Sequence, residues 1–170
     1  MSPGVIARVI TCSDKASRGE RVDRSGPAVQ QILEDAGYRV DGVVIVPDDV
    51  AAIERAIVTA IDAENVRLVV TTGGTGISPR DVTPEATRHV ADRMIPGFGE
   101  LMRARSLEKT AMAPLSRAGA ATRRTALIIN LPGSESGAVE NLRVVLHLIV
   151  HALELLSGKP VEHGDAEGRR

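Results

Sequence analysis

The stretch Arg67-Leu-Val-Val-Thr-Thr-Gly-Gly-Thr-Gly76 decides the fold class, because an apolar, β-prone run leads directly into a glycine-rich loop. Residues 67–72 are predicted to form a buried strand. The glycines at positions 73, 74 and 76 allow positive φ, and they let backbone N–H groups approach a ligand without obstruction by side chains. Such amides bind phosphate oxygens, and Thr72 and Thr75 add hydroxyl donors. The alternative is a tight turn that needs glycine only for its geometry.

Similar apolar runs lie on both sides of this stretch and alternate with segments of helical periodicity. Further strands are predicted at 5–12, 39–46 and 125–131, and helices at about 25–37, 48–61, 98–107 and 136–156, with another beginning at the Thr83-Pro84-Glu85 signal. Residues 108–123 are ambiguous and are read as a helical turn followed by an edge strand near 116–123. The alternation predicts an α/β fold, in which right-handed crossovers produce a mainly parallel sheet covered by helices on both sides.

The composition predicts one globular domain with an aliphatic core. The chain has 170 residues, of which 43% are hydrophobic and only 1% aromatic. We expect one domain at 1–157 and a polar, loose tail at 158–170. The lack of aromatic side chains argues against stacking on single-stranded nucleic acid, and the net charge of −1 argues against a nucleic-acid or membrane-surface partner.

The cysteine content and the apolar runs indicate a cytoplasmic protein. Cys12 is the single cysteine and cannot form an internal disulfide, and no charged-then-apolar leader is present. The apolar runs are far shorter than the ~20 residues that a membrane-crossing helix needs.

Small and acidic residues follow several predicted strands. The segments 13–14, 48–49, 73–81 and 132–134 each come after such a strand. Since ligands of parallel α/β sheets bind outside the carboxyl ends of the strands, we expect these four segments to form one composite site.

Two aspartates in these segments, Asp48 and Asp81, are candidates for a divalent cation. Mg²⁺ is usually held by one or two carboxylates together with substrate phosphates. Without a cation, two acids beside a phosphate site would repel the ligand. The alternatives are a helix N-cap for Asp48 and a solvated loop position for Asp81, and Asp49 competes with Asp48 for either role.

Other reactive residues have simpler interpretations. His147 and His151 have metal-ligand spacing, but the catalytic glutamate of an HExxH motif is missing, so we interpret them as helix-surface or subunit-contact residues. Cys12 ends a buried strand and is interpreted as a core residue. Walker, GxGxxG and GxSxG motifs are absent.

Four motifs occur in an order that resembles a known family. They are TTGGTGISPRDVTPE at 71–85, IPGFGELMR at 95–103, LSRAG at 115–119 and NLPGS at 130–134. The chain is similar over nearly its whole length to the MogA/MoaB family of molybdenum cofactor biosynthesis, the molybdopterin adenylyltransferases, which is related to domains of gephyrin and of plant Cnx proteins.

The resemblance implies a three-layer α/β/α sandwich, assembled as a homotrimer, with one antiparallel strand at 116–123. It also implies an enzyme that transfers AMP from ATP to the terminal phosphate of molybdopterin in a Mg²⁺-dependent reaction that releases pyrophosphate. The adenylylated product would pass to a molybdate-insertion protein.

Site residues follow from matching positions in the family. Asp48 and Asp81 match the two functional aspartates, with catalytic and metal-binding roles. The substrate- and nucleotide-binding positions are Ser13, Asp14, Thr72, Gly73, Gly74, Thr75, Gly76, Arg80, Gly133 and Ser134, with Arg80 as a phosphate contact. Asp23, Gly26 and Pro27 match a D-x-x-G-P element. Two alternatives stay open: a non-catalytic protein that binds molybdopterin or a precursor, and a phosphate-binding module for another nucleotide.

Overall fold

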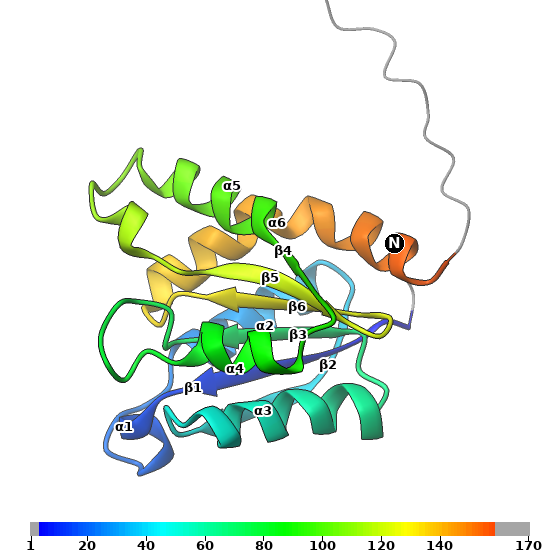
Figure 1. The fold of residues 1–170 in the computed structure, drawn as a ribbon, viewed down its shortest axis with the longest axis horizontal. Helices are drawn as coiled ribbons and strands as arrows, with labels where there is room; N and C mark the ends of the chain where they lie inside the picture. Colours follow the sequence, from blue (N-terminus) through cyan, green and yellow to red (C-terminus); the bar gives the residue numbers. More distant parts are fainter. Residues whose placement is uncertain (1–3, 159–170) are drawn as a thin grey trace, which may run out of the picture.

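Six strands and eight helical segments make up residues 4–158, the part of the chain that the computed structural model describes (Figure 1). The strands are β1 (Ile6–Cys12), β2 (Arg39–Val46), β3 (Leu68–Thr72), β4 (Arg93–Ile95), β5 (Gly119–Arg123) and β6 (Ala126–Leu131). The α-helices are α1 (Asp14–Ser17), α2 (Ser25–Asp35), α3 (Val50–Val58), α4 (Thr83–Val90), α5 (Pro96–Ser106) and α6 (Glu135–Leu156). A π-helical turn, η1 (Thr59–Ala63), extends α3, and a 3₁₀ turn, η2 (Ala113–Leu115), precedes β5.

The strands form one sheet in the order β2-β1-β3-β6-β5-β4. β1, β2, β3 and β6 are parallel, whereas β5 runs antiparallel to both β6 and β4. The expected mostly parallel sheet is confirmed, and its antiparallel strand lies within the segment 116–123 that the resemblance indicated. The prediction that this segment forms an edge strand was wrong, because β4 pairs with the other side of β5. The edge strand β4 was not predicted, because three largely exposed residues before Pro96 carry no readable pattern.

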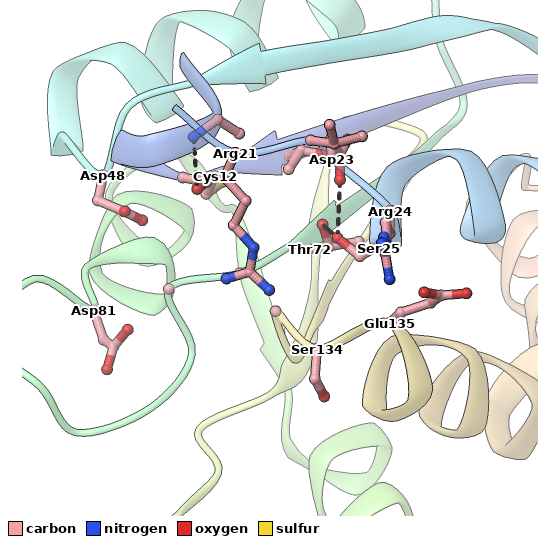
Figure 2. A pocket seen from close by; sticks show the side chains of 17 residues that line it. Cys12, Arg21, Asp23, Arg24, Ser25, Asp48, Thr72, Asp81, Ser134 and Glu135 are labelled. Carbon is pink, nitrogen blue, oxygen red and sulfur yellow. Dashed lines mark hydrogen bonds between the residues drawn. The ribbon is translucent and has the colours of Figure 1, made fainter. Parts of the chain in front are cut away.

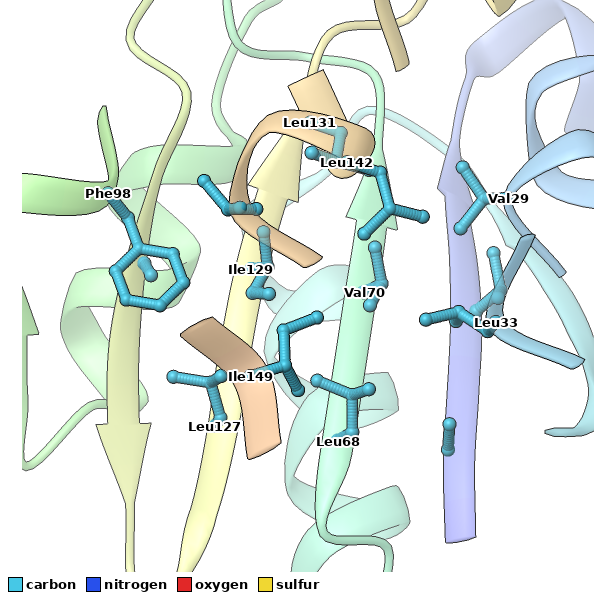
Figure 3. Packing of buried hydrophobic residues seen from close by; sticks show 14 of the residues in the cluster. Val29, Leu33, Leu68, Val70, Phe98, Leu127, Ile129, Leu131, Leu142 and Ile149 are labelled. Carbon is cyan, nitrogen blue, oxygen red and sulfur yellow. The ribbon is translucent and has the colours of Figure 1, made fainter. Parts of the chain in front are cut away.

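Helices cover both faces of the sheet, so that each face has its own core. Side chains alternate along each strand and therefore reach both cores. On one face, α2, α5 and α6 pack on the strands, and Figure 3 shows the side chains of α6 lying over β3 and β6. On the other face, Ile53 and Ile57 of α3 and Ala86 of α4 pack on Ile10 and Ile128. Each fully buried Leu or Ile contributes about 1.5–3 kcal/mol through removal of its surface from water.

Two helices, α6 and α4, begin one residue earlier than the sequence predicts, and a side-chain hydroxyl forms a hydrogen bond at each of these ends. α6 begins at Glu135 because the Ser134 hydroxyl caps it by accepting from the Gly137 amide. The signal at Thr83-Pro84-Glu85 would place Thr83 as the N-cap, but Thr83 is the first residue of α4 and its hydroxyl donates to the carbonyl of Gly73 instead of capping the helix. The polar stretch after β1 contains the short helix α1, which Ser13 caps through the amide of Ala16.

Within residues 4–158, no helix is long and apolar enough to span a membrane. Gly158, with φ of +68°, follows the end of α6 as predicted. The remainder of the predicted tail, 159–170, lies outside the described residues.

Candidate functional site

A cavity of about 400 Å³ opens at the carboxyl ends of the parallel strands (Figure 2). Its lining comes from six parts of the chain: 11–13 at the end of β1, Ala16 of α1, 21–25 leading into α2, Asp48 after β2, 72–74 at the end of β3 with Asp81 beyond them, and 133–135 after β6. The fold therefore brings the four strand-following segments to a single rim.

The glycine loop turns sharply at Gly73 and is fixed there by backbone contacts. Gly73 has φ of +95°, and a Cβ at this position would collide with the carbonyl oxygen of Cys12. Its N–H donates to Leu131, the last residue of β6, at 3.1 Å. The Thr83 hydroxyl donates to the Gly73 carbonyl at 2.9 Å. The loop is thus held between β1, β6 and α4 and leaves Gly73 and Gly74 on the cavity surface.

Asp48 and Asp49 have different positions, which separates the two candidates. Asp49 is the N-cap of α3, since its carboxylate accepts from the Ala52 amide at 2.8 Å. Asp48 lines the cavity, and its Oδ2 accepts from the backbone amide of Asp14 at 2.9 Å. Asp14 makes the reciprocal bond from its Oδ1, which accepts from the Asp48 amide at 3.0 Å. Of the two aspartates, Asp48 is therefore the one that can meet a ligand.

The electrostatic surroundings of Asp48 disfavour its charge. Burial raises the pKa of this carboxyl above its ordinary value, and the nearby charges of Asp14 and Asp81 act in the same direction. Arg80 has the opposite effect on Asp14, because the guanidinium hydrogen bond lowers the pKa of that carboxyl. Three carboxylates thus lie close enough to influence one another, and a cation among them would relieve their repulsion.

Asp81 faces the same cavity from the far end of the glycine loop. Its Oδ2 accepts from the Ser78 amide at 2.8 Å, and this oxygen lies 2.7 Å from where a Cβ of Gly76 would stand. No hydrogen bond among residues 4–158 uses Oδ1 of Asp48 or Oδ1 of Asp81, so each carboxylate has one oxygen available.

Arg117 holds the loop from outside and was not predicted as a site residue. Its amide donates to Thr75 at 2.7 Å, and its guanidinium donates to the carbonyls of Gly76 and Asp81, both at 2.7 Å. The same guanidinium forms an ion pair with Glu85. One side chain therefore fixes both ends of the segment that carries Asp81. Arg117 belongs to the LSRAG motif, which was the one sequence signal for it.

The D-x-x-G-P element forms another wall of the cavity. The Asp23 carboxylate accepts from the Thr11 hydroxyl at 2.7 Å, and it also accepts from the Gly26 amide at 3.0 Å. A Cβ at Gly26 would lie 2.6 Å from the Thr11 hydroxyl oxygen, so α2 can approach β1 this closely only with glycine there. The Ser25 and Thr72 hydroxyls are 2.9 Å apart, which ties this wall to the glycine loop.

Six of the predicted substrate- and nucleotide-binding residues, together with the two aspartates, line the cavity: Ser13, Thr72, Gly73, Gly74, Gly133, Ser134, Asp48 and Asp81. Four do not contribute to its lining: Asp14, Thr75, Gly76 and Arg80. The side chain of Thr75 is buried. Arg80 donates to the Asp14 carboxylate at 2.7 Å, and this ion pair joins the loop after β3 to the segment after β1.

Cys12 contributes to the lining of the cavity, whereas His147 and His151 do not. Cys12 is buried, and burial raises the pKa of its thiol to about 12, so it is not a thiolate near neutral pH. His147 and His151 lie on the exposed side of α6. Among residues 4–158 there is no group of three or more His, Cys, Asp or Glu side chains that could hold a metal ion by themselves. A cation at Asp48 and Asp81 would need further oxygen ligands from a bound substrate or water.

The cavity also contains charged residues that sequence reasoning did not assign to it, namely Arg21, Arg24 and Glu135. Arg21 and Arg24 belong to the polar stretch between β1 and α2, where no periodicity or motif distinguishes one arginine from another. Glu135 is the first residue of α6, and it was missed because the helix was predicted to begin at residue 136.

A mostly parallel sheet, covered on both faces and carrying a cavity at its carboxyl edge, is characteristic of α/β proteins that bind small ligands. Comparison with known proteins shows which family within this class the chain resembles. Residues 8–153 match the family described as "Probable molybdopterin binding domain". The molybdopterin adenylyltransferase of Helicobacter pylori (strain J99) is 43% identical over 154 residues, which cover 88% of this chain and 86% of that protein. The enzyme of the same name from Escherichia coli (strain K12) is 40% identical and covers 91% and 86%.

Comparison with solved structures supports the same family. The molybdopterin biosynthesis enzyme MoaB from Thermus thermophilus superposes with a TM-score of 0.85 at 46% identity, covering 92% of this chain and 98% of that one. The chain belongs to the molybdopterin-binding family of molybdenum cofactor biosynthesis, as the four motifs had indicated.

Proposed function

We propose that this protein is a molybdopterin adenylyltransferase, which transfers AMP from ATP to the terminal phosphate of molybdopterin and releases pyrophosphate. The observation that carries the proposal is the meeting of Asp48, Asp81 and the amides of the glycine loop around one cavity. The names of relatives at 40–43% identity over most of the chain support it.

Such a reaction joins two polyanions, so the protein must position them and offset their charge. The cavity has groups for both tasks. The amide of Gly74 and the hydroxyl of Ser134 can donate to phosphate oxygens, whereas the Gly73 amide already donates to the Leu131 carbonyl. The attacking group is a phosphate oxygen that is already ionised at neutral pH, and the chemistry therefore requires no strong general base.

Asp48 and Asp81 are the residues that would hold Mg²⁺. The donor set fits this ion, because each carboxylate has one oxygen outside the hydrogen bonds that orient it, and because the crowded acids disfavour charge on Asp48. Mg²⁺ commonly binds through one or two carboxylates together with substrate phosphates. When bound, the ion supplies charge neutralisation of the phosphate chain.

The test is incubation of the purified protein with molybdopterin, ATP and Mg²⁺, followed by measurement of pyrophosphate and of adenylylated molybdopterin. We expect Asp48→Asn and Asp81→Asn each to lower the rate about 10²–10³-fold, the usual loss on removal of one preorganised electrostatic group. Molybdopterin binding should be largely retained. Asp49→Asn is the matched control, since Asn also caps helices well.

Three results would contradict the proposal. Normal turnover by both variants would show that the assigned carboxylates are not involved. Molybdopterin binding by the wild type without pyrophosphate release would instead identify a non-catalytic binding protein, and selective binding of another nucleotide would identify a different phosphate-binding module.

The wider proposal is a cytoplasmic homotrimer that passes its product to a molybdate-insertion protein. Exposed apolar side chains at the two edges of the sheet, Ile45 on β2 and Met94 on β4, offer surface for subunit contacts. Light scattering should give three times the monomer mass, and a monomeric mass at working concentration would contradict the trimer.

A further inference from the structure

The cavity is rich in acids for a site that binds polyanions. Asp23, Asp48, Asp81 and Glu135 all line it. Asp23 is bonded to the Thr11 hydroxyl and the Gly26 amide, but these neutral partners do not cancel its charge. A cation at Asp48 and Asp81 would not offset the charges of Asp23 and Glu135. A phosphate-bearing ligand therefore needs cationic side chains elsewhere in the cavity.

Most arginines near the cavity already have acidic partners. Arg80 is paired with Asp14, and Arg117 with Glu85. Arg18, three residues before Arg21, is paired with Glu20 at 2.7 Å. Such pairs neutralise the cation and restrict the geometry in which it could meet a ligand.

Arg21 and Arg24 are different, because both line the cavity and neither side chain has a hydrogen bond or ion pair with any residue of the described chain. Figure 2 shows the Arg21 side chain extending across the opening, with Asp48 and Asp81 on one side and Ser134 on the other. Its guanidinium offers five N–H donors in a planar fork that matches phosphate oxygens. Arg24 also lines the cavity, but Figure 2 places its side chain at the edge, near Glu135.

We infer that Arg21 binds the phosphate oxygens of the substrate directly, opposite the glycine-loop amides. Its positive charge then acts on the phosphates together with the cation that Asp48 and Asp81 hold. The inference deepens the proposed function and rests on it for the identity of the ligand. It assigns to Arg21 a substrate contact that would offset part of the acidic charge of the cavity.

The test separates binding from turnover. Calorimetry with Mg-ATP and no molybdopterin measures affinity for the phosphate chain, and pyrophosphate release measures the reaction. We expect Arg21→Ala to weaken Mg-ATP binding about 10- to 100-fold, the usual cost of losing a charge-assisted hydrogen-bonding group. Arg21→Lys should recover part of the loss, because an ammonium restores the charge without the fork.

Arg18→Ala is the matched control, because it removes the same charge from the same exposed segment without touching the cavity. It should bind Mg-ATP as the wild type does. Thermal unfolding of all variants should be nearly unchanged, since the Arg21 side chain has no hydrogen bond or ion pair within residues 4–158 and the Arg18–Glu20 pair is exposed.

The outcomes distinguish this inference from the proposed function. If the wild type turns over and Arg21→Ala binds Mg-ATP within about twofold of it, the inference fails while the function stands. Equal losses in Arg21→Ala and Arg18→Ala would show a general field effect and would also overturn it. Arg21-dependent binding without any pyrophosphate release would support the contact and overturn the proposed reaction.

Discussion

Replacement of Asp49 by alanine should destabilise the protein and leave the reaction intact, although the neighbouring aspartate lines the cavity. The Asp49 carboxylate accepts from the Ala52 amide at 2.8 Å and caps α3. Loss of an N-cap of this kind costs about 1 kcal/mol. For a chain of this size that corresponds to a decrease in Tm of about 2–4 °C. Ile53 and Ile57 are fully buried and keep α3 in place, so the helix should remain folded.

The companion variant Asp48→Asn should have the opposite effect on stability. Because burial and the neighbouring acids raise the pKa of Asp48, the folded protein binds this proton more readily than the unfolded chain does. Stability therefore falls as pH rises through the interval between the ordinary aspartate pKa and the raised one. Asparagine removes that penalty. The Tm of Asp48→Asn should equal that of the wild type at low pH and exceed it near neutrality.

The assay is thermal unfolding by circular dichroism with a chelator present, at several pH values, together with pyrophosphate release at room temperature. Asp49→Ala should show the lower Tm with a rate within about twofold of the wild type, because the cap does not touch the cavity. The reasoning is wrong if Asp49→Ala loses as much activity as Asp48→Asn at an unchanged Tm. It is also wrong if Asp48→Asn is less stable than the wild type at neutral pH.

Two further predictions concern the support of the glycine loop. Arg117→Met removes the charged hydrogen bonds to Gly76 and Asp81, which should lower the free energy of unfolding in denaturant by about 2 kcal/mol. It should also lower kcat/KM more than Asp49→Ala does. An unchanged kcat/KM would show that the loop holds its shape without this side chain. Gly73→Ala places a Cβ against the Cys12 carbonyl at a residue with φ of +95°. This should lower the free energy of unfolding by about 3 kcal/mol or more. If the variant is as stable as the wild type, the backbone can relax at this position.

The central strands and the helices that cover them could be predicted because their apolar residues recur with regular spacing. Leu68 to Val70 and Leu127 to Ile129 are fully buried and read as strands without further context. β4 and α1 could not be predicted in this way. β4 depends on pairing with β5, and α1 is a four-residue helix that depends on the Ser13 cap.

Within the site, residues on strand ends could be predicted, whereas residues whose role depends on a distant partner could not. Asp48 and Asp49 are equally good caps in the sequence, and only the exchange of hydrogen bonds with Asp14, 34 residues earlier, separates them. Arg117 reaches the glycine loop because the chain enters the antiparallel strand β5 beside it. Arg21 is distinguished from Arg18 by the absence of an acidic partner within the described chain, which no linear pattern encodes.

The position of β6 has a consequence for biosynthesis. Among the strands of residues 4–158, this one is synthesised last, yet it lies in the middle of the sheet between β3 and β5. Until it emerges, the edge of β3 has no neighbour on that side and can pair with other nascent chains. Residues 133–135, which complete the cavity, follow it directly. Insertion of a single strand therefore ends the period of exposure to aggregation and creates ligand-binding competence in the same step.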